Sequence, residues 1–490
     1  MLKPTLEEAK TMAKGYHFVP VAFEMLADTY TPINLFLTLK ESSNNCFLLE
    51  SADNGEQWGR YSFIGVHPKA EIKIKDCCVT FIDKNGISKS ETADPVGFIS
   101  KLLSAYSSPK VKGIPKLAGG LVGYFAYDTV RYIEKRLNHP PNDDLNMPDC
   151  HFLLCDEIIA FDHLKHKTII TVNVSTEGDF EKNYHAGAER AKEIAKQIRY
   201  SAPKMERQTP KGELVINSNL SKEEFIAGVN TAKEYIKNGD IFQVVLSQRF
   251  VAENPPDSFD VYRILRATNP SPYMYYFQFN DYYIAGASPE MLVSVEDNMV
   301  STRPIAGTVK RGQNEKEDKE LENLLISDKK EQAEHTMLVD LGRNDVGKVS
   351  RFGSVEVTHF MRVEKYSQVM HLVSDVKGQL REDKTSLDAL MAVLPAGTLS
   401  GAPKVRAMEI IDELENQKRG LYGGTVGYIA FDGDIDTCIA IRTVLFKNNK
   451  AYVQAGAGIV ADSVPKKEYE ETESKAKAML KAIMEARDMI

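Results

Sequence analysis

The sequence predicts an α+β protein in which antiparallel β-sheets pack against helices. Two observations lead to this prediction. Strand patterns outnumber the helices that could serve as crossovers, and parallel strands need such crossovers. In addition, turn signals at Asp432-Gly433-Asp434 and Asn448-Asn449 join consecutive strands as hairpins, which makes those neighbouring strands antiparallel.

Length and composition are those of a globular protein with two or more domains. The chain has 490 residues, of which 43% are hydrophobic and 27% are charged, and its net charge is −8. This modest negative charge argues against nucleic-acid binding. No apolar run reaches about 18 residues, and the first residues, MLKPTLEEAK, lack the apolar core of a signal peptide. We therefore expect no membrane span and a cytoplasmic location.

The cysteine pattern also indicates a reducing compartment. None of the six cysteines belongs to a Cys-x-x-Cys pair, and Cys150 and Cys155 lie among apolar residues. We expect reduced thiols in the core.

Residues 1–200 predict mixed strands and a few helices. The expected elements are strands at 46–51, 60–65 and 119–125, a strand pair at 151–161 and 167–174, and a helix at 180–198. The following segment, 201–215, is polar and carries two prolines, Pro203 and Pro210, which is typical of a linker. We therefore expect an N-terminal region at 1–200, a linker at 201–215 and a second domain at 216–490.

The second domain begins with a helix that Ser221 caps, with Glu224 placed for a capping box, and this helix ends at Gly239. In the strand that follows, at 241–250, alternation puts Gln243 and Val245 on one face. The other expected elements are a turn at 269–274 entering an aromatic strand, a tight turn at 287–290, a charged helix at 315–341, strands and turns at 349–380, a helix at 384–393, strands at 425–431, 436–446 and 451–455, and a helix from Pro465.

The stretch Pro395–Gly424 has the pattern of an anion-binding loop before a helix. Small residues and the hydroxyl of Thr398 precede Pro403, which suits the first helical position, and Gly420 can close the helix. Such a loop brings N–H groups to an anion at the positive end of a helix, and Lys404 adds charge. An ordinary loop and helix cap is the alternative interpretation.

Two helices each carry a Glu-x-x-Glu pair. Glu331 and Glu334 form one pair, and Glu468 and Glu471 form the other. Residues three apart share a helix face, so each pair can present two carboxylates to one point. Four carboxylates without a Cys or His cluster suit a hard, oxygen-liganded ion, and Mg²⁺ is the natural choice beside an anionic substrate. The alternative is a solvated helix face.

Glycines and cations form a second candidate constellation. The backbone donors are Gly307-Thr308, Gly397-Thr398, Gly423-Gly424 and Gly456-Ala457-Gly458, and the cations include Arg442 and Lys475. His371 follows a polar turn and is a candidate base. A histidine beside Val, Met and Leu can equally be a core residue.

An ordered series of motifs resembles the anthranilate synthase component I family, which belongs to the chorismate-utilising enzymes. The motifs are IFQVVLS (241–247), NPSPYM (269–274), GASPE (286–290), RPIAGT (303–308), EHTMLVDLGRND (334–345), VMHLVS (369–374), GTLSGAPKVRAM (397–408), YGGTVGY (422–428), DTCIAIRT (436–443) and QAGAGIVADSVP (454–465). The N-terminal LLES (48–51) and RYSFIG (60–65) extend the resemblance over nearly the whole chain. It implies a fold in which antiparallel sheets sandwich helices.

The resemblance implies that the protein converts chorismate and ammonia into anthranilate and pyruvate. Mg²⁺ would be held by Glu334 and Glu471, with Glu331 and Glu468 close by, directly or through water. Glu290 would protonate the leaving hydroxyl group, which requires its acid form.

The other implied roles concern the substrate and the second step. Tyr422, Arg442 and the amides of Gly456-Ala457-Gly458 would hold the substrate carboxylates. Gly307 and Thr308 would line the pocket. His371 would take the C2 proton, and Thr398 and Lys475 would position substrate and metal ligands.

Regulation and partners also follow from the resemblance. L-tryptophan would bind at Ser51, Pro272, Tyr273 and Met274 and inhibit this first step of tryptophan biosynthesis. A separate glutamine amidotransferase subunit would supply ammonia, in a heterotetramer of two large and two small subunits, because the chain has no recognisable glutaminase of its own.

Two positions distinguish this interpretation from related activities. Water-using relatives carry a lysine base at the position matching Gln243, and a neutral amide cannot activate water in that way. Aminodeoxychorismate synthases typically have a lysine where this chain has Ala306, and they are the nearest alternative. A non-catalytic sensor of chorismate or tryptophan is the alternative from another class, which the complete set of acid, base and metal candidates disfavours.

Overall fold

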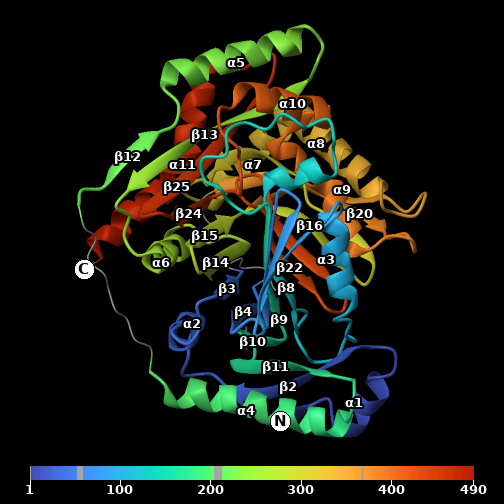
Figure 1. Cartoon of the computed structure of the whole chain (residues 1–490). Coiled ribbons are helices and arrows are strands. Elements are labelled where there is room, and N and C mark those ends of the chain that lie inside the picture. Colours follow the sequence, from blue (N-terminus) through green and yellow to red (C-terminus); the bar gives the residue numbers. More distant parts are fainter. Residues whose placement is uncertain (1, 52–58, 203–211, 366–368, 490) are drawn as a thin grey trace.

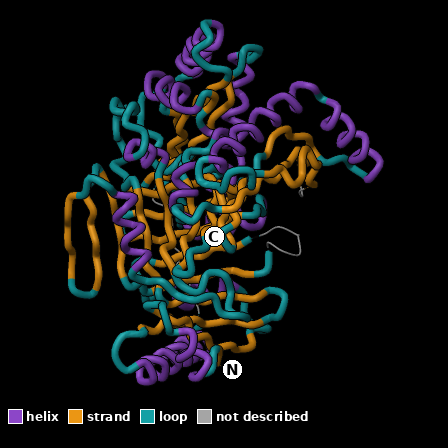
Figure 2. Tube along the Cα trace, turned by 90° about the vertical axis from the view of Figure 1, so that its right-hand side faces the viewer, coloured by secondary structure: helices purple, strands orange, loops and turns teal. Residues whose placement is uncertain are grey.

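The computed structural model describes residues 2–51, 59–202, 212–365 and 369–489. Within these residues the strands form two antiparallel sheets, one of 13 strands and one of 12. We call them the first and the second sheet. Figure 1 shows the strands stacked through the middle of the molecule, and Figure 2 shows the same strands, turned by 90°, with helices around them. The predicted fold class is confirmed.

The first sheet runs the length of the molecule. Its order is β1 (Leu2–Lys3), β2 (Phe18–Leu26), β11 (Lys167–Ser175), β10 (Glu157–Asp162), β4 (Tyr61–Val66), β3 (Cys46–Glu50), β14 (Tyr273–Phe279), β15 (Tyr282–Ser288), β24 (Thr443–Lys447), β25 (Lys450–Ile459), β13 (Gln243–Glu253) and β12 (Val215–Ser218). The short β21 (Gly401–Ala402) pairs with β13 beside this path.

The second sheet carries the remaining strands. Its order is β18 (Ile305–Lys310), β20 (Val369–Gln379), β17 (Met299–Thr302), β16 (Met291–Glu296), β23 (Ile435–Ile439), β22 (Thr425–Ala430), β8 (Gly120–Phe125), β9 (Cys150–Cys155), β5 (Ala70–Lys75), β6 (Cys78–Asp83) and β7 (Gly86–Glu91). β19 (Glu356–Lys365) pairs with β20.

Strands from both halves of the sequence share each sheet. β3 pairs with β14 in the first sheet, and β8 pairs with β22 in the second. Of the expected linker at 201–215, residues 203–211 lie outside the described residues. The division at this linker stays a prediction, and it separates the halves along the chain while both halves build both sheets.

The helices cover the sheets. They are α1 (Leu6–Met12), α2 (Pro32–Lys40), α3 (Pro95–Ser104), α4 (Phe180–Tyr200), α5 (Lys222–Lys237), α6 (Ser258–Thr268), α7 (Glu315–Ser327), α8 (Lys329–Gly347), α9 (Ser386–Val393), α10 (Lys404–Leu414) and α11 (Pro465–Asp488), with 3₁₀ turns η1 (Tyr127–Tyr132) and η2 (Gly397–Leu399). α4 lies under β2 and β11 at the bottom of Figure 1. The predicted capping box of Ser221 and Glu224 begins α5.

The two sheets also contact each other directly through an aromatic core. Phe47 and Phe277 from the first sheet pack in one buried cluster with Tyr124 and Val426 from the second. The hydroxyl groups of Tyr124 and Tyr282 lie 2.7 Å apart across this interface, and His151 bonds both Tyr282 and Glu71. The two sheets are therefore held together by large aromatic side chains as well as by the helices that pack against them.

Several expected elements are divided in the structure. The strand expected at 151–161 is β9 and β10, which meet at Asp156 and belong to different sheets. The strand expected at 436–446 is likewise β23 and β24, again in different sheets. The charged helix expected at 315–341 breaks at Asp328, whose side chain accepts hydrogen bonds from the first N–H groups of α8.

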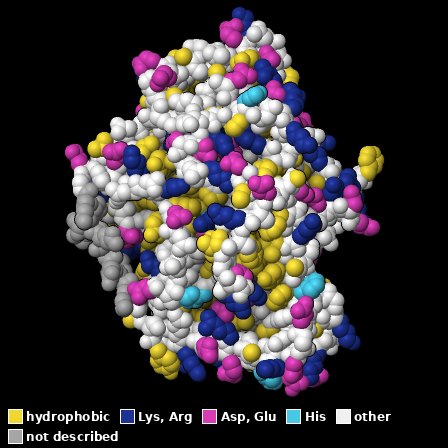
Figure 3. Space-filling model, in the orientation of Figure 1, with side chains coloured by type: hydrophobic (Ala, Val, Ile, Leu, Met, Phe, Trp, Pro, Cys, Tyr) yellow, Lys and Arg dark blue, Asp and Glu magenta, His cyan; other side chains and the backbone are white. Residues whose placement is uncertain are grey.

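The stretch Pro395–Gly424 also differs in detail from its prediction. Pro403 is the N-cap of α10 and not its first residue, and the helix ends at Leu414, six residues before Gly420. Gly420 has a φ of 58° in the later turn that leads to β22. Among the described residues no helix is long and apolar enough to cross a membrane. Acidic and basic side chains are interspersed on the face shown in Figure 3.

Candidate active site

Two helices bring the predicted carboxylates together. Glu331 and Glu334 lie on α8, and Glu468 and Glu471 lie on α11. Burial raises the pKa of Glu331, Glu334 and Glu468, and repulsion by the nearby Glu471 raises each of them further. The two Glu-x-x-Glu pairs therefore face each other and are not separate solvated surfaces.

Lys475 links this acidic group to the first sheet. Its Nζ atom lies 2.7 Å from Oε1 of Glu471 and donates a hydrogen bond to the carbonyl oxygen of Gly456 at 3.0 Å. Within the described part of the chain, no three acidic, His or Cys side chains converge as a preformed metal centre. The carboxylate oxygen atoms of the four glutamates repel one another and fit a hard cation. Such a cation would offset part of the negative charge that Lys475 now neutralises at Glu471.

Glu290 is a buried carboxyl group between β15 and β16. Burial raises its pKa to about 7, whereas a hydrogen bond from Thr398 and the charge of Lys475 act in the opposite direction. Thr398 lies on η2, and its hydroxyl donates to Oε1 of Glu290 at 3.1 Å. The backbone around Glu290 is fixed because its carbonyl accepts from the N–H of Ile439 at 3.0 Å.

His371 projects from β20 toward β18. Its Nδ1 atom lies 2.9 Å from the carbonyl oxygen of Gly307 and 3.0 Å from Oγ1 of Thr308. A ring N–H that donates to the Gly307 carbonyl makes Nε2 the proton-accepting nitrogen of the neutral ring. Burial and the charge of Arg442 lower the pKa of His371, so the ring is neutral at neutral pH.

Gly307 connects this histidine to the acidic helices. Its φ is 61°, and a Cβ atom at this position would lie 3.1 Å from Oε2 of Glu331 and 2.9 Å from the side chain of Leu325. Glycine fits both the backbone conformation and the close approach. The structure thus brings Gly307, Thr308 and His371 beside the carboxylates of α8.

The remaining predicted substrate-binding residues lie around Lys475 and β25. Arg442 donates from Nη1 to the carbonyl oxygen of Lys475 at 2.9 Å, and burial lowers its pKa. Tyr422 is placed against β25, because a Cβ atom at Gly456 would lie 2.8 Å from its hydroxyl group. Gly456-Ala457-Gly458 pairs with β13 through Ser247, Leu246 and Val245.

Gln243 begins β13 and is buried beside Gly458. A Cβ atom at Gly458 would lie 2.7 Å from Nε2 of Gln243. Among the described residues, Oε1 of Gln243 has no hydrogen-bond partner. A buried acceptor without a donor is costly, so this oxygen suits a ligand that brings an N–H or O–H group.

The four predicted inhibitor residues lie around a different cavity of about 810 Å³ between the two sheets. Ser51, Pro272, Tyr273 and Met274 all line it, and so does Asp436. The Tyr273 hydroxyl donates to Asp436 at 3.0 Å, and the pKa of this buried acid is raised to about 6. Oγ of Ser51 has no partner within the described residues. The cavity also reaches Met291, the residue after Glu290.

Some charges predicted from sequence serve other purposes. Lys404 is buried, with its Nζ atom 2.6 Å from Asp345 and 3.1 Å from the carbonyl oxygen of Val393, so it does not offer its charge to an anion at the loop. Sequence reasoning also missed Asp436 and Arg419. Asp436 lies within the DTCIAIRT motif, and Arg419 stands four residues after Glu415, a spacing that signals an ion pair.

Comparisons with known proteins agree over almost the whole chain. A family model for chorismate binding enzymes matches residues 44–481. Anthranilate synthase component 1 of Acetivibrio thermocellus is 52% identical over 492 residues, which is 99% of each chain. The same component of Pseudomonas aeruginosa is 48% identical over 483 residues, covering 97% of this chain and 98% of that relative. The crystal structure of anthranilate synthase component I from Streptococcus pneumoniae matches with a TM-score of 0.76 and 43% identity, covering 87% of this chain and 93% of that one. The chain belongs to the family of chorismate binding enzymes.

Proposed function

We propose that this protein is the chorismate-converting component of an anthranilate synthase. It converts chorismate and ammonia into anthranilate, pyruvate and water. The observation that carries this proposal is a buried acid, Glu290, whose pKa of about 7 keeps much of it protonated at neutral pH, in a chain 52% identical to an anthranilate synthase component 1 over nearly its full length.

The first step needs an acid at the departing hydroxyl group. Glu290 donates its proton to the 4-hydroxyl of chorismate, which leaves as water while ammonia adds at C2. The hydrogen bond from Thr398 at 3.1 Å orients the carboxyl group. Oε1 of Gln243, an acceptor without a donor among the described residues, can receive an N–H of ammonia. Ammonia needs no further activation, since it is already a nucleophile.

The second step needs a base at the C2 hydrogen. His371 is neutral, and the contact of Nδ1 with the Gly307 carbonyl leaves Nε2 to accept the proton. The electron pair of the broken C–H bond makes the ring aromatic while the ether C–O bond at C3 breaks. The enolate of pyruvate leaves and takes up a proton to become pyruvate. Arg442, Tyr422 and Gly456-Ala457-Gly458 hold the substrate carboxylates during both steps, and Gly307 and Thr308 line the pocket.

Glu334 and Glu471 are the residues we propose as direct Mg²⁺ ligands, with Glu331 and Glu468 binding directly or through water. The burial of Glu331, Glu334 and Glu468, and the repulsion that each of them feels from Glu471, support this assignment. When bound, Mg²⁺ supplies positive charge at the ring carboxylate and makes the ring more electrophilic. Lys475, which pairs with Glu471, positions this ligand.

The partner and the regulator belong to the same proposal. A glutamine amidotransferase subunit supplies ammonia in a cytoplasmic heterotetramer of two large and two small subunits. L-tryptophan binds at Ser51, Pro272, Tyr273 and Met274 and inhibits this first step of its own biosynthesis. The grouping of these four residues around one cavity of about 810 Å³ supports the regulatory site.

The test is product identification from chorismate with Mg²⁺ and three nitrogen sources. With ammonium ions the purified chain should release anthranilate and pyruvate in equal amounts. With glutamine alone it should release neither, and adding an amidotransferase subunit should restore the reaction. Release of isochorismate or of 4-amino-4-deoxychorismate in place of anthranilate would assign the chain to a related activity. If chorismate is not consumed at all, the non-catalytic sensor becomes the better interpretation.

A further inference from the structure

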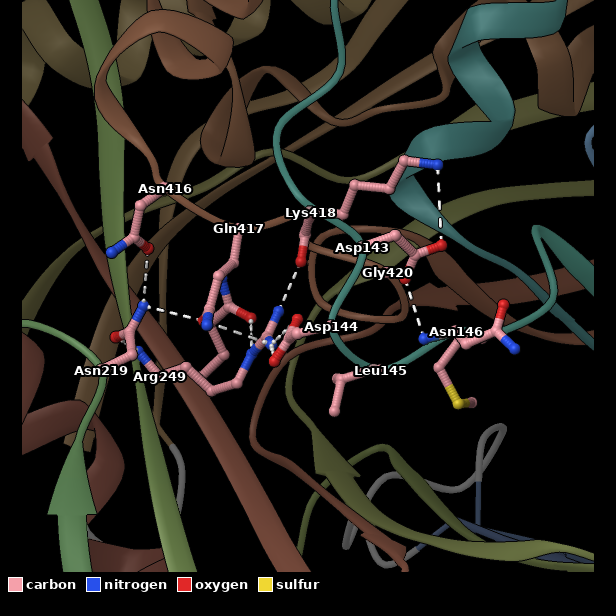
Figure 4. Close-up of polar contacts among 12 residues, drawn as sticks. Asp143, Asp144, Leu145, Asn146, Asn219, Arg249, Asn416, Gln417, Lys418 and Gly420 are labelled. Atoms are coloured by element: carbon pink, nitrogen blue, oxygen red, sulfur yellow. Dashed lines mark hydrogen bonds and ion pairs between the residues drawn. The ribbon is translucent and has the colours of Figure 1, made fainter.

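Two buried arginines hold the segment between α10 and β22, residues 415–424. Figure 4 shows the first, Arg249 of β13, which contacts Asp144 at 2.8 and 3.0 Å and the carbonyl oxygen of Lys418. Beside it, the Asn219 amide bonds Gln417 at 3.1 Å. The segment is therefore fixed to a strand of the first sheet, and through Asp144 to a loop from the N-terminal half.

The second, Arg419, belongs to the segment itself and is 3% exposed. Its guanidinium group donates twice to Glu415, at 2.8 and 2.6 Å. The same group donates to the carbonyl oxygen of Leu399 at 2.6 Å and to that of Val245 at 2.7 Å. Four hydrogen bonds in fixed directions tie this one side chain to Glu415, the C-cap residue of α10, and to η2 and β13.

These contacts place Arg419 directly behind the candidate active site. Leu399 follows Thr398, the residue that hydrogen-bonds Glu290. Val245 lies two residues after Gln243 on the same strand. The guanidinium plane also lies over the ring of Tyr422, 5.7 Å from its centroid, and over the ring of Tyr127, at 4.8 Å.

Glu415 neutralises Arg419 and fixes it in turn. Its Oε1 atom accepts hydrogen bonds from the N–H and the hydroxyl group of Ser247 at 2.9 and 2.8 Å. Gln454 of β25 donates to the same hydroxyl at 2.8 Å. The charge of Arg419 is thus balanced within the protein, and what the side chain supplies to the site is geometry.

We infer that Arg419 is a positioning residue for the reaction, which sets Thr398, Tyr422 and the start of β13 relative to one another. This inference rests on the proposed function. Lysine could keep the ion pair with Glu415 but cannot reach three carbonyl and carboxylate partners in one plane. Because a misplacement of about 1 Å can cost 10²-fold in rate, a loosened η2 should impair proton donation by Glu290.

The test compares Arg419→Lys with Arg131→Lys. Arg131 is the matched control, since it makes the same two-bonded contact with a carboxylate of α10, Asp412, at 2.6 and 2.8 Å. Among the described residues it donates to no carbonyl group of η2 or β13. In Arg419→Lys, kcat for anthranilate formation should fall about 10- to 100-fold, with a smaller rise in the KM for chorismate. Arg131→Lys should keep both constants within about threefold.

A pH profile separates positioning from a loss of folded protein. The Thr398 hydrogen bond lowers the pKa of Glu290, so a displaced Thr398 should move the alkaline limb of kcat/KM to higher pH in Arg419→Lys. Glu415→Gln, which loosens Arg419 without removing it, should show the same shift to a smaller degree. A folded Arg419→Lys or Glu415→Gln protein with the parental kcat and pH profile would overturn the inference. An inactive parent protein would instead refute the proposed function.

Discussion

The hydroxyl group of Thr398 lies 3.1 Å from a carboxyl oxygen of Glu290, although 108 positions separate the two residues in the chain. Burial raises the pKa of Glu290, and this hydrogen bond opposes the rise because a carboxylate accepts it better than a carboxylic acid. The two influences leave the pKa at about 7, where the group can both hold and release a proton.

Glu290 should therefore set the alkaline limit of the reaction. The acid form is required, so kcat/KM should fall about tenfold per pH unit above a pH of about 7. Thr398→Val removes the hydrogen bond that lowers the pKa and should move this limb to higher pH. Glu290→Gln should lower kcat by about 10² to 10⁴ below a pH of about 7, where the parent holds the acid form. An unchanged limb in Thr398→Val would show that another group controls it.

His371→Ala should slow elimination far more than amination. A positioned base contributes on the order of 10² to 10⁴ in rate, and ammonia addition does not use this histidine. The variant should accumulate 2-amino-2-deoxyisochorismate, which mass spectrometry of a single turnover can detect. Unconsumed chorismate would assign His371 to an earlier step, and parental anthranilate formation would make it an ordinary core histidine.

Glu334→Ala and Glu471→Ala should each abolish Mg²⁺-dependent turnover without unfolding the protein. Both should also lose Mg²⁺ binding in titration calorimetry. Glu470→Ala is the control on the same helix, because Glu470 is exposed and contacts Lys466 at 3.9 Å. A variant that keeps parental activity at low Mg²⁺ would remove that glutamate from the ligand set.

Ser51→Phe should relieve inhibition by tryptophan and leave uninhibited turnover nearly intact. The larger side chain would enter the cavity that Ser51 lines, whereas the acidic helices and His371 lie outside it. Inhibition curves for parent and variant, at equal chorismate concentration, measure the change. Equal sensitivity of the two proteins would place the tryptophan site elsewhere.

His151 should make the fold sensitive to acid. It is buried between the sheets, and burial lowers its pKa from 6.5 to about 4. The unfolded chain therefore binds more protons between these values, and stability should fall as the pH drops from 6.5 toward 4, by roughly 3 kcal/mol. His151→Gln should flatten this dependence in urea unfolding. An equally steep dependence in the variant would assign the acid sensitivity to carboxylates.

Local signals in the sequence predicted local structure well. The capping box of α5, the long helices α4 and α11 and the turns at 432–434 and 448–449 follow from side chains a few residues apart. The spacing of the Glu-x-x-Glu pairs likewise predicted two carboxylates on one helix face. The family resemblance then supplied what spacing could not, namely that these pairs belong with Glu290, His371 and Arg442.

The errors arose where distant residues decide the outcome. The run at 436–446 reads as one strand, but the chain turns at Arg442, whose φ is 52°, and passes from the second sheet to the first. This turn puts Arg442 at the site. Lys404 looked available for an anion because its partner, Asp345, lies 59 positions earlier. Neither the turn at Arg442 nor the ion pair of Lys404 with Asp345 could be predicted from the residues next to them in the sequence.

The pairing of β3 with β14 also constrains how the protein is made. Residues 46–50 lie beside residues 274–278, and the sheet that contains them is completed only by β25, which ends at Ile459. The edge of β3 is covered once β14 is made, but β8 must wait for β22 at Thr425–Ala430. A ribosome must therefore release most of the chain before both strand edges of the N-terminal half are covered. Until then these edges are open to other chains, so slow synthesis or early truncation should yield aggregates in place of a smaller working enzyme.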